Sequence, residues 1–197
     1  MRLKHNYWYF AKAVNKEKCD KIISLCLKQK KFKSEVEGPE KGKNLRRTDI
    51  RDCKISWISS KWIYSILNPF IHSANKQAGW NFQWDWNESC QFTTYEKSHR
   101  YNWHNDQVHL TQTNENFKNK IRKLSLTLQL TDPSKYSGGE FQLKWFDGGE
   151  VRIITAKDAK ELGTIIIFPS FVFHQITPII KGRRQALVNW SIGKPFL

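Results

Sequence analysis

From residue 80 onward the chain consists of short extended segments separated by turn signals, and this pattern restricts the fold more than any other feature. Phe82, Trp84 and Trp86 alternate with polar residues, which is the two-residue period of a half-buried strand. Further extended runs are expected at about 89–95, 101–110, 121–131, 140–146, 150–155, 164–173 and 184–192. Asp-Pro and Gly-Gly turn signals lie between them, at 132–133, 137–139 and 147–149. Many short strands joined by turns predict a jelly roll.

The first 79 residues carry two helical patterns instead. Apolar residues recur at helical spacing from about 16 to 31, and Asn15 is placed to cap that helix. A second pattern runs from about 60 to 78 across Pro69, which predicts one kinked helix or two abutting pieces. Gly79 suits the C-terminal end of this helix.

These patterns together predict a mainly β, α+β fold in which a jelly roll is backed by N-terminal helices. An extended segment at 7–14 is expected to precede the first helix. We expect a single domain over 1–197, with 1–79 as helical support and flexible loop and 80–197 as the jelly-roll core.

The stretch between the two helical patterns breaks all periodicity. Residues 37–44 are rich in Gly, Lys and Glu, a composition typical of a flexible loop. Arg46, Arg47 and Arg51 follow it. We expect residues 36–54 to form either a solvated linker or a mobile flap that meets a substrate.

Composition bears on the partners and cellular location of the protein but does not indicate which reaction it catalyses. The formal net charge is +15, with 17 Lys and Arg against 7 Asp and Glu in residues 1–61. Such a basic segment attracts acidic partners, nucleic acid among them, but the absence of a compact basic run favours a solvated surface. The four cysteines form no Cys-x-x-Cys pair, so reduced thiols in a cytoplasmic protein are expected. Neither a membrane span nor a signal peptide is expected, because no long apolar run is present.

A His-x-Asp pair, His104 and Asp106, is the most informative local motif. On an extended strand alternate side chains point to the same face, so an imidazole and a carboxylate would converge. The pair alone occurs readily by chance, but His174 and Arg184 follow far along the chain. Two His and one carboxylate form the facial triad of non-haem Fe(II) oxygenases. An Arg beyond the last His could hold a dicarboxylate through a bidentate fork.

Strand parity supports a polar interior beside this motif. In 121–131, four Leu share one face, while Ser125, Thr127 and Gln129 share the other. In 184–192, Arg184 points the same way as Trp190. A buried Arg is costly unless its charge is paired, and a bound dicarboxylate would pair it.

The order and spacing of these residues resemble the Fe(II)/2-oxoglutarate-dependent dioxygenases, and most closely their prolyl 4-hydroxylase group with its allied small bacterial hydroxylases. The resemblance covers roughly residues 90–192. The matching stretches are Tyr101–Asp106, Lys123–Leu128, Tyr136–Phe141, Phe168–His174, and Pro178, Gly182, Arg184 and Trp190.

The resemblance implies a double-stranded β-helix that uses Fe(II), 2-oxoglutarate and O2, with ascorbate as a supporting reductant. It assigns metal ligation to His104, Asp106 and His174. It assigns the 5-carboxylate of 2-oxoglutarate to Arg184.

Two further cofactor-binding residues follow from the same resemblance. Tyr95 matches the family's tyrosine that helps hold this carboxylate, and Gln129 falls where some relatives place another hydrogen-bond donor. The candidate substrate contacts are Tyr101, Trp103, Trp190 and Arg51.

Three functions remain open at this point. The first is hydroxylation of a C–H bond in a peptide or protein, most naturally at proline. The second is a nucleic-acid oxygenase of the AlkB type. That family carries an Arg-x-Asn-x-Thr-x-Arg motif after its last His, whereas here Arg184 is followed at the same spacing by Ala186, Val188 and Trp190. The third is a jelly-roll binding module without catalysis, against which the complete set of candidate ligands argues.

Overall fold

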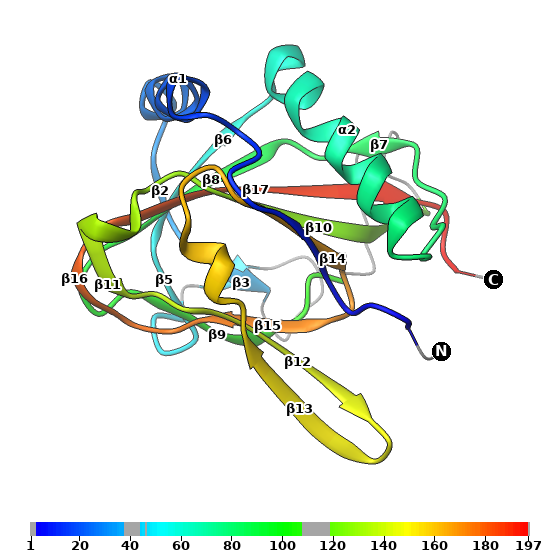
Figure 1. Cartoon of the computed structure of the whole chain (residues 1–197). Helices are drawn as coiled ribbons and strands as arrows, with labels where there is room; N and C mark the ends of the chain where they lie inside the picture. Colours follow the sequence, from blue (N-terminus) through cyan, green and yellow to red (C-terminus); the bar gives the residue numbers. More distant parts are fainter. Residues whose placement is uncertain (1–2, 38–43, 46, 108–118, 197) are drawn as a thin grey trace.

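The computed structural model of the chain describes residues 3–37, 44–45, 47–107 and 119–196. Two antiparallel sheets face each other, and two helices cover the outer side of the larger sheet (Figure 1). The predicted jelly roll backed by helices is therefore confirmed. The helical elements are α1 (Lys16–Leu27), α2 (Lys61–Gln77), and the 3-10 helices η2 (Pro133–Lys135) and η3 (Lys157–Lys160).

The larger sheet carries the helices on its outer face and the site on its inner face. Its strands are, in spatial order, β1 (Trp8–Phe10), β14 (Ile165–Pro169), β10 (Ile121–Gln129), β17 (Arg184–Gly193), β8 (Cys90–Tyr95), β6 (Lys54–Ile58) and β2 (Phe32–Lys33), and β7 (Trp86–Asn87) also pairs with β17.

The smaller sheet closes the jelly roll from the other side. Its order is β13 (Glu150–Thr155), β12 (Phe141–Asp147), β15 (Phe173–Ile176), β9 (Arg100–His104) and β5 (Arg51–Asp52). Two short pairs complete the described strands: β11 (Tyr136–Gly138) with β16 (Ile179–Gly182), and β3 (Val36–Glu37) with β4 (Asn44–Leu45). The β12–β13 hairpin projects from the body (Figure 1).

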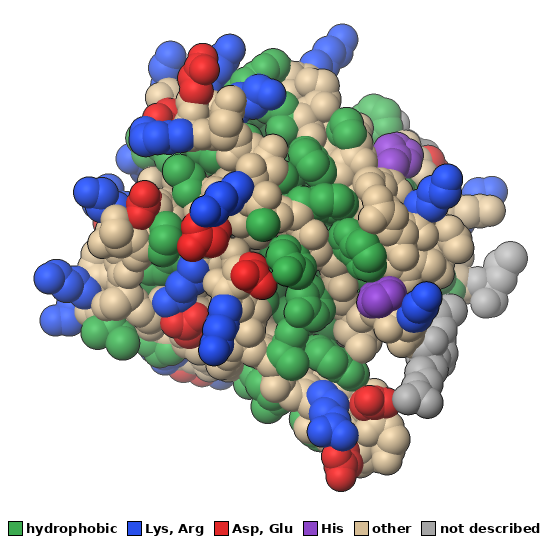
Figure 2. Space-filling model, viewed as in Figure 1, with side chains coloured by type: hydrophobic (Ala, Val, Ile, Leu, Met, Phe, Trp, Pro, Cys, Tyr) green, Lys and Arg blue, Asp and Glu red, His purple; other side chains and the backbone are tan. Residues whose placement is uncertain are grey.

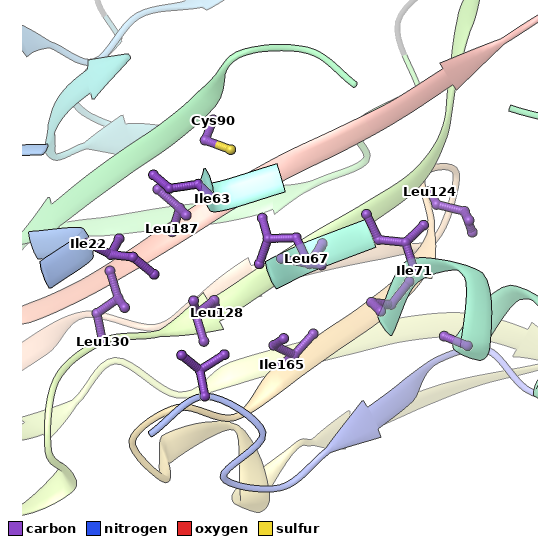
Figure 3. Packing of buried hydrophobic residues seen from close by; sticks show 14 of the residues in the cluster. Ile22, Ile63, Leu67, Ile71, Cys90, Leu124, Leu128, Leu130, Ile165 and Leu187 are labelled. Carbon is purple, nitrogen blue, oxygen red and sulfur yellow. The ribbon is translucent and has the colours of Figure 1, made fainter. Parts of the chain in front are cut away.

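The larger sheet separates two hydrophobic cores. Leu124, Leu126 and Leu128 of β10 pack against the helices, as strand parity predicted. Figure 3 shows this core, with Leu67 and Ile71 of α2 lying over the strands. The second core lies between the sheets and contains Phe141, Leu143, Ile166, Phe168 and Ile179. The polar face of β10 turns toward this second space, where the candidate ligands lie.

Capping residues and buried stripes account for the ends of the two helices, and Pro69 does not interrupt the second. Asn15 accepts a hydrogen bond from Lys18 N at 3.0 Å, which confirms the predicted N-cap. Helix α1 ends at Leu27 rather than near 31, because its buried stripe ends at Cys26. Helix α2 continues through Pro69 as one helix, and Gly79 follows it with φ +72°.

Several predicted strands differ in extent from the observed ones: 7–14 is strand only at Trp8–Phe10, and the strand expected at 101–110 ends at His104. Within 82–87 only Trp86–Asn87 forms a strand, because Phe82 bonds through both backbone groups to the Asn75 side chain and not to a neighbouring strand. The run 164–173 is not one strand but two, β14 and β15, which belong to different sheets. A turn at 170–172 separates them, with Val172 N donating to Pro169 O at 2.9 Å.

The stretch 32–54, expected to be irregular, contains short strands. β2 and β5 form within it, and β6 follows directly. β5 pairs with β9, so Arg51 is buried opposite Tyr101 and is no part of a mobile loop. Residues 38–43 and 46 of the expected flap lie outside the described residues.

The surface is basic without a single compact basic patch in the face seen in Figure 2, where Lys and Arg side chains are spread with Asp and Glu among them. Among the described helices, none combines the length and the apolar character needed to cross a membrane.

Candidate active site

Three side chains that are far apart in the sequence converge between the sheets. His104 ends β9, Asp106 follows two residues later, and the antiparallel register sets His174 of β15 opposite His104. His104 Nε2 lies 3.8 Å from Asp106 Oδ1, and His174 Nε2 lies 3.5 Å from Asp106 Oδ2. One ligand atom from each residue lies within 4.8 Å of the other two. The structure therefore brings the three expected metal ligands together.

Backbone carbonyls orient both imidazoles. His104 Nδ1 lies 2.8 Å from Asn102 O, and His174 Nδ1 lies 3.1 Å from Val172 O. Because a carbonyl only accepts, each Nδ1 carries the proton and donates it. In a neutral imidazole held this way, Nε2 carries the lone pair on the carboxylate side of the cluster, which is the form in which histidine ligates a metal.

Burial and neighbouring charges in the cluster favour a neutral His104 and an ionised Asp106, the forms that bind a metal ion. Burial, reinforced by the neighbouring His174, lowers the pKa of His104 to about 3, so its imidazole is neutral near pH 7. Burial by itself would raise the pKa of Asp106, but His174, His104 and Arg122 outweigh it and lower that pKa to about 2. A neutral imidazole beside an ionised carboxylate needs to release no proton before it binds a metal ion.

Ser125 and Ser170, which the sequence did not single out, contact Asp106. Ser125 Oγ donates to Asp106 Oδ2 at 2.8 Å, and Ser170 O accepts from Asp106 N at 2.8 Å. The polar face predicted for β10 contained a signal for Ser125 but not its partner. Ser170 lies in the turn that was expected to be strand.

Arg184 lies in the same interior, on β17 beside β8. The register sets it opposite Tyr95, and its guanidinium lies 5.8 Å from the centre of that ring. Arg184 is 3% exposed, and within the described residues no carboxylate forms an ion pair with it. Burial raises the pKa of the Tyr95 hydroxyl, which stays a neutral hydrogen-bond donor. A buried cation beside a phenol is a place for an anionic group.

Gly139 allows the backbone to lie close to the Arg184 side chain. Its φ of +62° is a left-handed conformation, and a Cβ there would lie 2.4 Å from Ile179 Cδ1 and 3.1 Å from Arg184 Cδ. The Gly-Gly turn signal thus has a second role besides turning the chain. It lets the backbone pass close to the arginine stem.

Gln129 is also interior, but protein groups already bind its amide. Gln129 Nε2 donates to Thr131 O at 3.0 Å and to Tyr136 Oη at 3.1 Å. Its Oε1 is buried and has no hydrogen-bond partner among the described residues. The side chain lies on β10 opposite Ala186, on the strand that carries Arg184.

Comparison with known proteins identifies the family. Residues 90–192 match the sequence model of the 2OG-Fe(II) oxygenase superfamily. The chain belongs to this superfamily. A PKHD-type hydroxylase of Teredinibacter turnerae is 30% identical over 101 residues, which cover 51% of this chain and 41% of the relative. A PKHD-type hydroxylase of Synechococcus sp. (strain CC9605) is 33% identical over 94 residues, covering 46% of this chain and 35% of the relative. The matched part thus spans less than half the length of these relatives.

Solved structures extend the likeness over nearly the whole chain. A Pseudomonas putida prolyl-4-hydroxylase superposes with a TM-score of 0.65 at 17% identity, covering 97% of this chain and 94% of that one. A viral collagen prolyl hydroxylase from Paramecium Bursaria Chlorella virus-1, determined as a 2OG complex, gives 0.66 at 16% identity and covers 97% of each chain. At these identities the likeness shows the fold.

Of the candidate substrate residues in this superfamily member, Tyr101 lies against a metal-ligand candidate, and Arg51 lies against Tyr101. The Tyr101 ring stacks on His104 with centroids 3.4 Å apart, and the Arg51 guanidinium lies 4.5 Å from the Tyr101 ring. Arg51 also donates to Gln91 Oε1. Tyr101 and Arg51 thus pack in two successive layers on the His104 side of the site.

The two tryptophans differ. Trp190 is buried with the Arg122 guanidinium 3.9 Å from its ring, and Arg122 forms a bidentate ion pair with Glu88 that the sequence did not predict. The Trp190 indole N–H is buried and has no hydrogen-bond partner among the described residues. Trp103 lies instead under Lys144, which also covers the partly exposed Phe173. The structure therefore does not bring Trp103 to the ligands.

The donor set fits Fe(II). Two imidazole Nε2 atoms and one carboxylate form the set that non-haem Fe(II) oxygenases use, and the three residues leave the remaining coordination positions to other ligands. Arg184 is buried in the same interior, and no carboxylate among the described residues pairs with its guanidinium. The interior between the sheets therefore contains both a possible metal-ligand set and a buried cation.

Proposed function

We propose that this chain is a Fe(II)- and 2-oxoglutarate-dependent dioxygenase that hydroxylates a C–H bond, in a prolyl residue of a peptide or protein. The observation that carries the proposal is the convergence of His104, Asp106 and His174 within 4.8 Å inside a jelly roll. Membership of the 2OG-Fe(II) oxygenase superfamily supports it.

Each residue has a definite task in this proposal. His104 and His174 present Nε2 to the metal because their Nδ1–H groups donate to carbonyls, and Asp106 adds a charged oxygen. Arg184, whose guanidinium lies 5.8 Å from the centre of the Tyr95 ring, binds the 5-carboxylate of 2-oxoglutarate. When bound, Fe(II) and 2-oxoglutarate supply the oxidation, in which O2 is consumed, succinate and CO2 are formed, and one oxygen atom enters the substrate C–H bond. Ascorbate serves as reductant for the metal.

The substrate class is supported by related proteins. The relatives are called PKHD-type hydroxylases, and the similar structures include a prolyl hydroxylase from Trichoplax adhaerens in complex with a peptide fragment. That bound peptide supports a peptide or protein as the substrate here, and the hydroxylase names of the relatives support the class of reaction. The four buried free cysteines support a reducing, cytoplasmic location.

Two other functions are less well supported. A nucleic-acid oxygenase would need a basic strand-binding surface beside the site, and here Trp190 stands where the AlkB pattern has its second Arg. A binding module without catalysis would not need buried histidines with their Nε2 atoms directed at a carboxylate. Both alternatives are separated from the proposal by the products formed.

The test is turnover of 2-oxoglutarate with Fe(II), ascorbate and a proline-containing peptide library. We expect succinate together with a peptide that gains one oxygen atom in mass. His174→Ala removes one of three ligands and should reduce both products to background. His72→Ala, a histidine that packs on Trp84 away from the site, should leave them unchanged. Wild-type succinate formation by His174→Ala would contradict the assignment, and no succinate from the wild-type chain would favour a binding module.

A further inference from the structure

Three chain segments meet at the Asp106 carboxylate. They are the residues after β9, the middle of β10, and the turn at 170–172 between β14 and β15. Ser125 Oγ lies 2.8 Å from Asp106 Oδ2 and 3.0 Å from Ser170 Oγ. Both serines are 0% exposed, so their hydroxyls must bond to one another and to the protein.

The direction of these hydrogen bonds follows from the chemistry of the groups. The oxygens of the Asp106 carboxylate accept hydrogen bonds, and Ser125 Oγ donates to Oδ2 at 2.8 Å. This bond uses the one hydroxyl proton of Ser125. Ser170, whose hydroxyl faces Ser125, then donates to Ser125 Oγ. The result is a one-way chain from Ser170 through Ser125 to the carboxylate.

The backbone of the same turn acts on two ligands at once. Ser170 O accepts from Asp106 N at 2.8 Å, and Val172 O accepts from His174 Nδ1 at 3.1 Å. Ser170 N in turn donates to Lys123 O of β10 at 3.0 Å, which fixes the turn to the larger sheet. The break between β14 and β15 is thus the point at which two of the three ligands are oriented.

Resting on the proposed function, we infer that Ser125 and Ser170 are positioning residues for the metal ligand Asp106. The hydroxyl of Ser125 holds Oδ2 and prevents the carboxylate from rotating about its terminal bond. Ser170 polarises that hydroxyl and fixes the rotamer of Ser125. Asp106 is then presented to the two Nε2 atoms in one orientation before any metal binds.

This arrangement predicts an effect on metal affinity and not only on stability. Partners that orient a ligating carboxylate typically contribute about 10–100-fold to metal affinity. Ser125→Ala removes the donor and leaves Oδ2 without its hydrogen bond in a buried site. Ser170→Ala leaves the Ser125–Asp106 bond in place, so it should cost less. Because Ser170 acts through Ser125, the double variant should behave like Ser125→Ala alone.

The experiment measures Mn(II) binding to the full chain without 2-oxoglutarate or O2, by the electron paramagnetic resonance of free Mn(II). We expect an affinity about 10–100-fold weaker for Ser125→Ala and a few-fold weaker for Ser170→Ala. Ser125→Thr keeps the hydroxyl and should retain most of the affinity. Ser56→Ala is the matched control, because it removes an equally buried hydroxyl that donates to Cys26 O, on the helix side of the larger sheet.

Thermal unfolding of the metal-free chains separates stability from affinity. We expect Ser125→Ala and Ser56→Ala to lose similar stability while only Ser125→Ala loses affinity. Equal Mn(II) affinity in wild type and Ser125→Ala would overturn this inference alone, whereas a wild-type chain that binds no Mn(II) would overturn the proposed function and this inference with it. If Ser125→Ala does not fold, Ser170→Ala decides, and an unchanged affinity there rejects the positioning role.

Discussion

Arg183 and Arg184 are adjacent in the sequence and have opposite environments. Arg184 is 3% exposed over the Tyr95 ring, whereas the Arg183 side chain is 60% exposed and pairs with Glu96 at 3.0 Å. The strand sends one guanidinium inward and the next one outward. This pair offers a built-in comparison of the same residue type at a ligand site and at a solvated site.

Arg184→Lys should raise the KM for 2-oxoglutarate by at least about tenfold, because an ammonium lacks the planar fork that bonds a carboxylate at two points. Arg183→Lys should leave this KM within about twofold, since an exposed ion pair contributes little. Succinate formation at varied 2-oxoglutarate measures both. If the two variants give the same KM, the carboxylate partner is not Arg184.

Among individual residues, those that belong to a spaced motif could be predicted from the sequence. His104, Asp106, His174 and Arg184 were named from the sequence, and the structure places all four in one interior. Ser170 could not be found, because its contact depends on a turn that the apolar run concealed. Trp103 was named through its neighbours in the motif, although a strand sends adjacent side chains to opposite faces.

Helix α2 contains its least favourable residue at an exposed position. Pro69 lies in the interior of the helix, where it removes one backbone donor and crowds the carbonyl four residues earlier. The helix nevertheless continues, because Leu67 and Ile71 on its buried face pack into the core on both sides of the proline. Tertiary packing here overrides local propensity.

Pro69→Ala should therefore raise the free energy of unfolding by about 1–3 kcal/mol, since the variant regains a hydrogen bond without disturbing the buried face. Denaturant titration followed by circular dichroism measures this gain. Ser65→Ala, an exposed position one turn earlier, should gain only about 0.5 kcal/mol. A loss of stability in Pro69→Ala would show that the ring itself makes a favourable contact.

At the scale of elements, long periodic segments were predictable and short strands were not. The helical patterns and the β10 alternation span several periods, so the sequence alone indicates them. β5 and β11 are only two and three residues long, too short to show a period, and pairing with distant partners makes them strands. β14 and β15 were merged because both are apolar, while hydrogen bonding assigns them to different sheets.

The larger sheet has a hydrophobic core on each face, and the two cores have different roles. The core between the helices and the larger sheet contains Leu67 and includes the leucine face of β10, whereas Ser125 on the opposite face of that strand bonds to Asp106. The core between the sheets contains Leu143, whose strand position is directly opposite His174. The first core therefore stabilises the fold, and the second also supports the site.

The assignment of strands to two sheets could not be read from the sequence. Alternation along one strand indicates which side chains share a face, but it carries no information on which distant strand lies alongside. The site depends on this strand pairing, because His104 and His174 are brought together by the pairing of β9 with β15. The family resemblance supplied the convergence that physical patterns alone left open.

The two cores can be told apart by matched cavities. Leu67→Ala and Leu143→Ala both truncate a fully buried leucine, so each should lower the free energy of unfolding by about 2–5 kcal/mol. Under conditions where both variants stay folded, Leu67→Ala should keep wild-type Mn(II) affinity. Leu143→Ala should weaken it several-fold, because the cavity lies beside His174 and allows that imidazole to shift. Mn(II) titration alongside denaturant unfolding gives both quantities. Equal affinities in the two variants would mean that carbonyl and hydroxyl hydrogen bonds hold the ligands without help from the packing between the sheets.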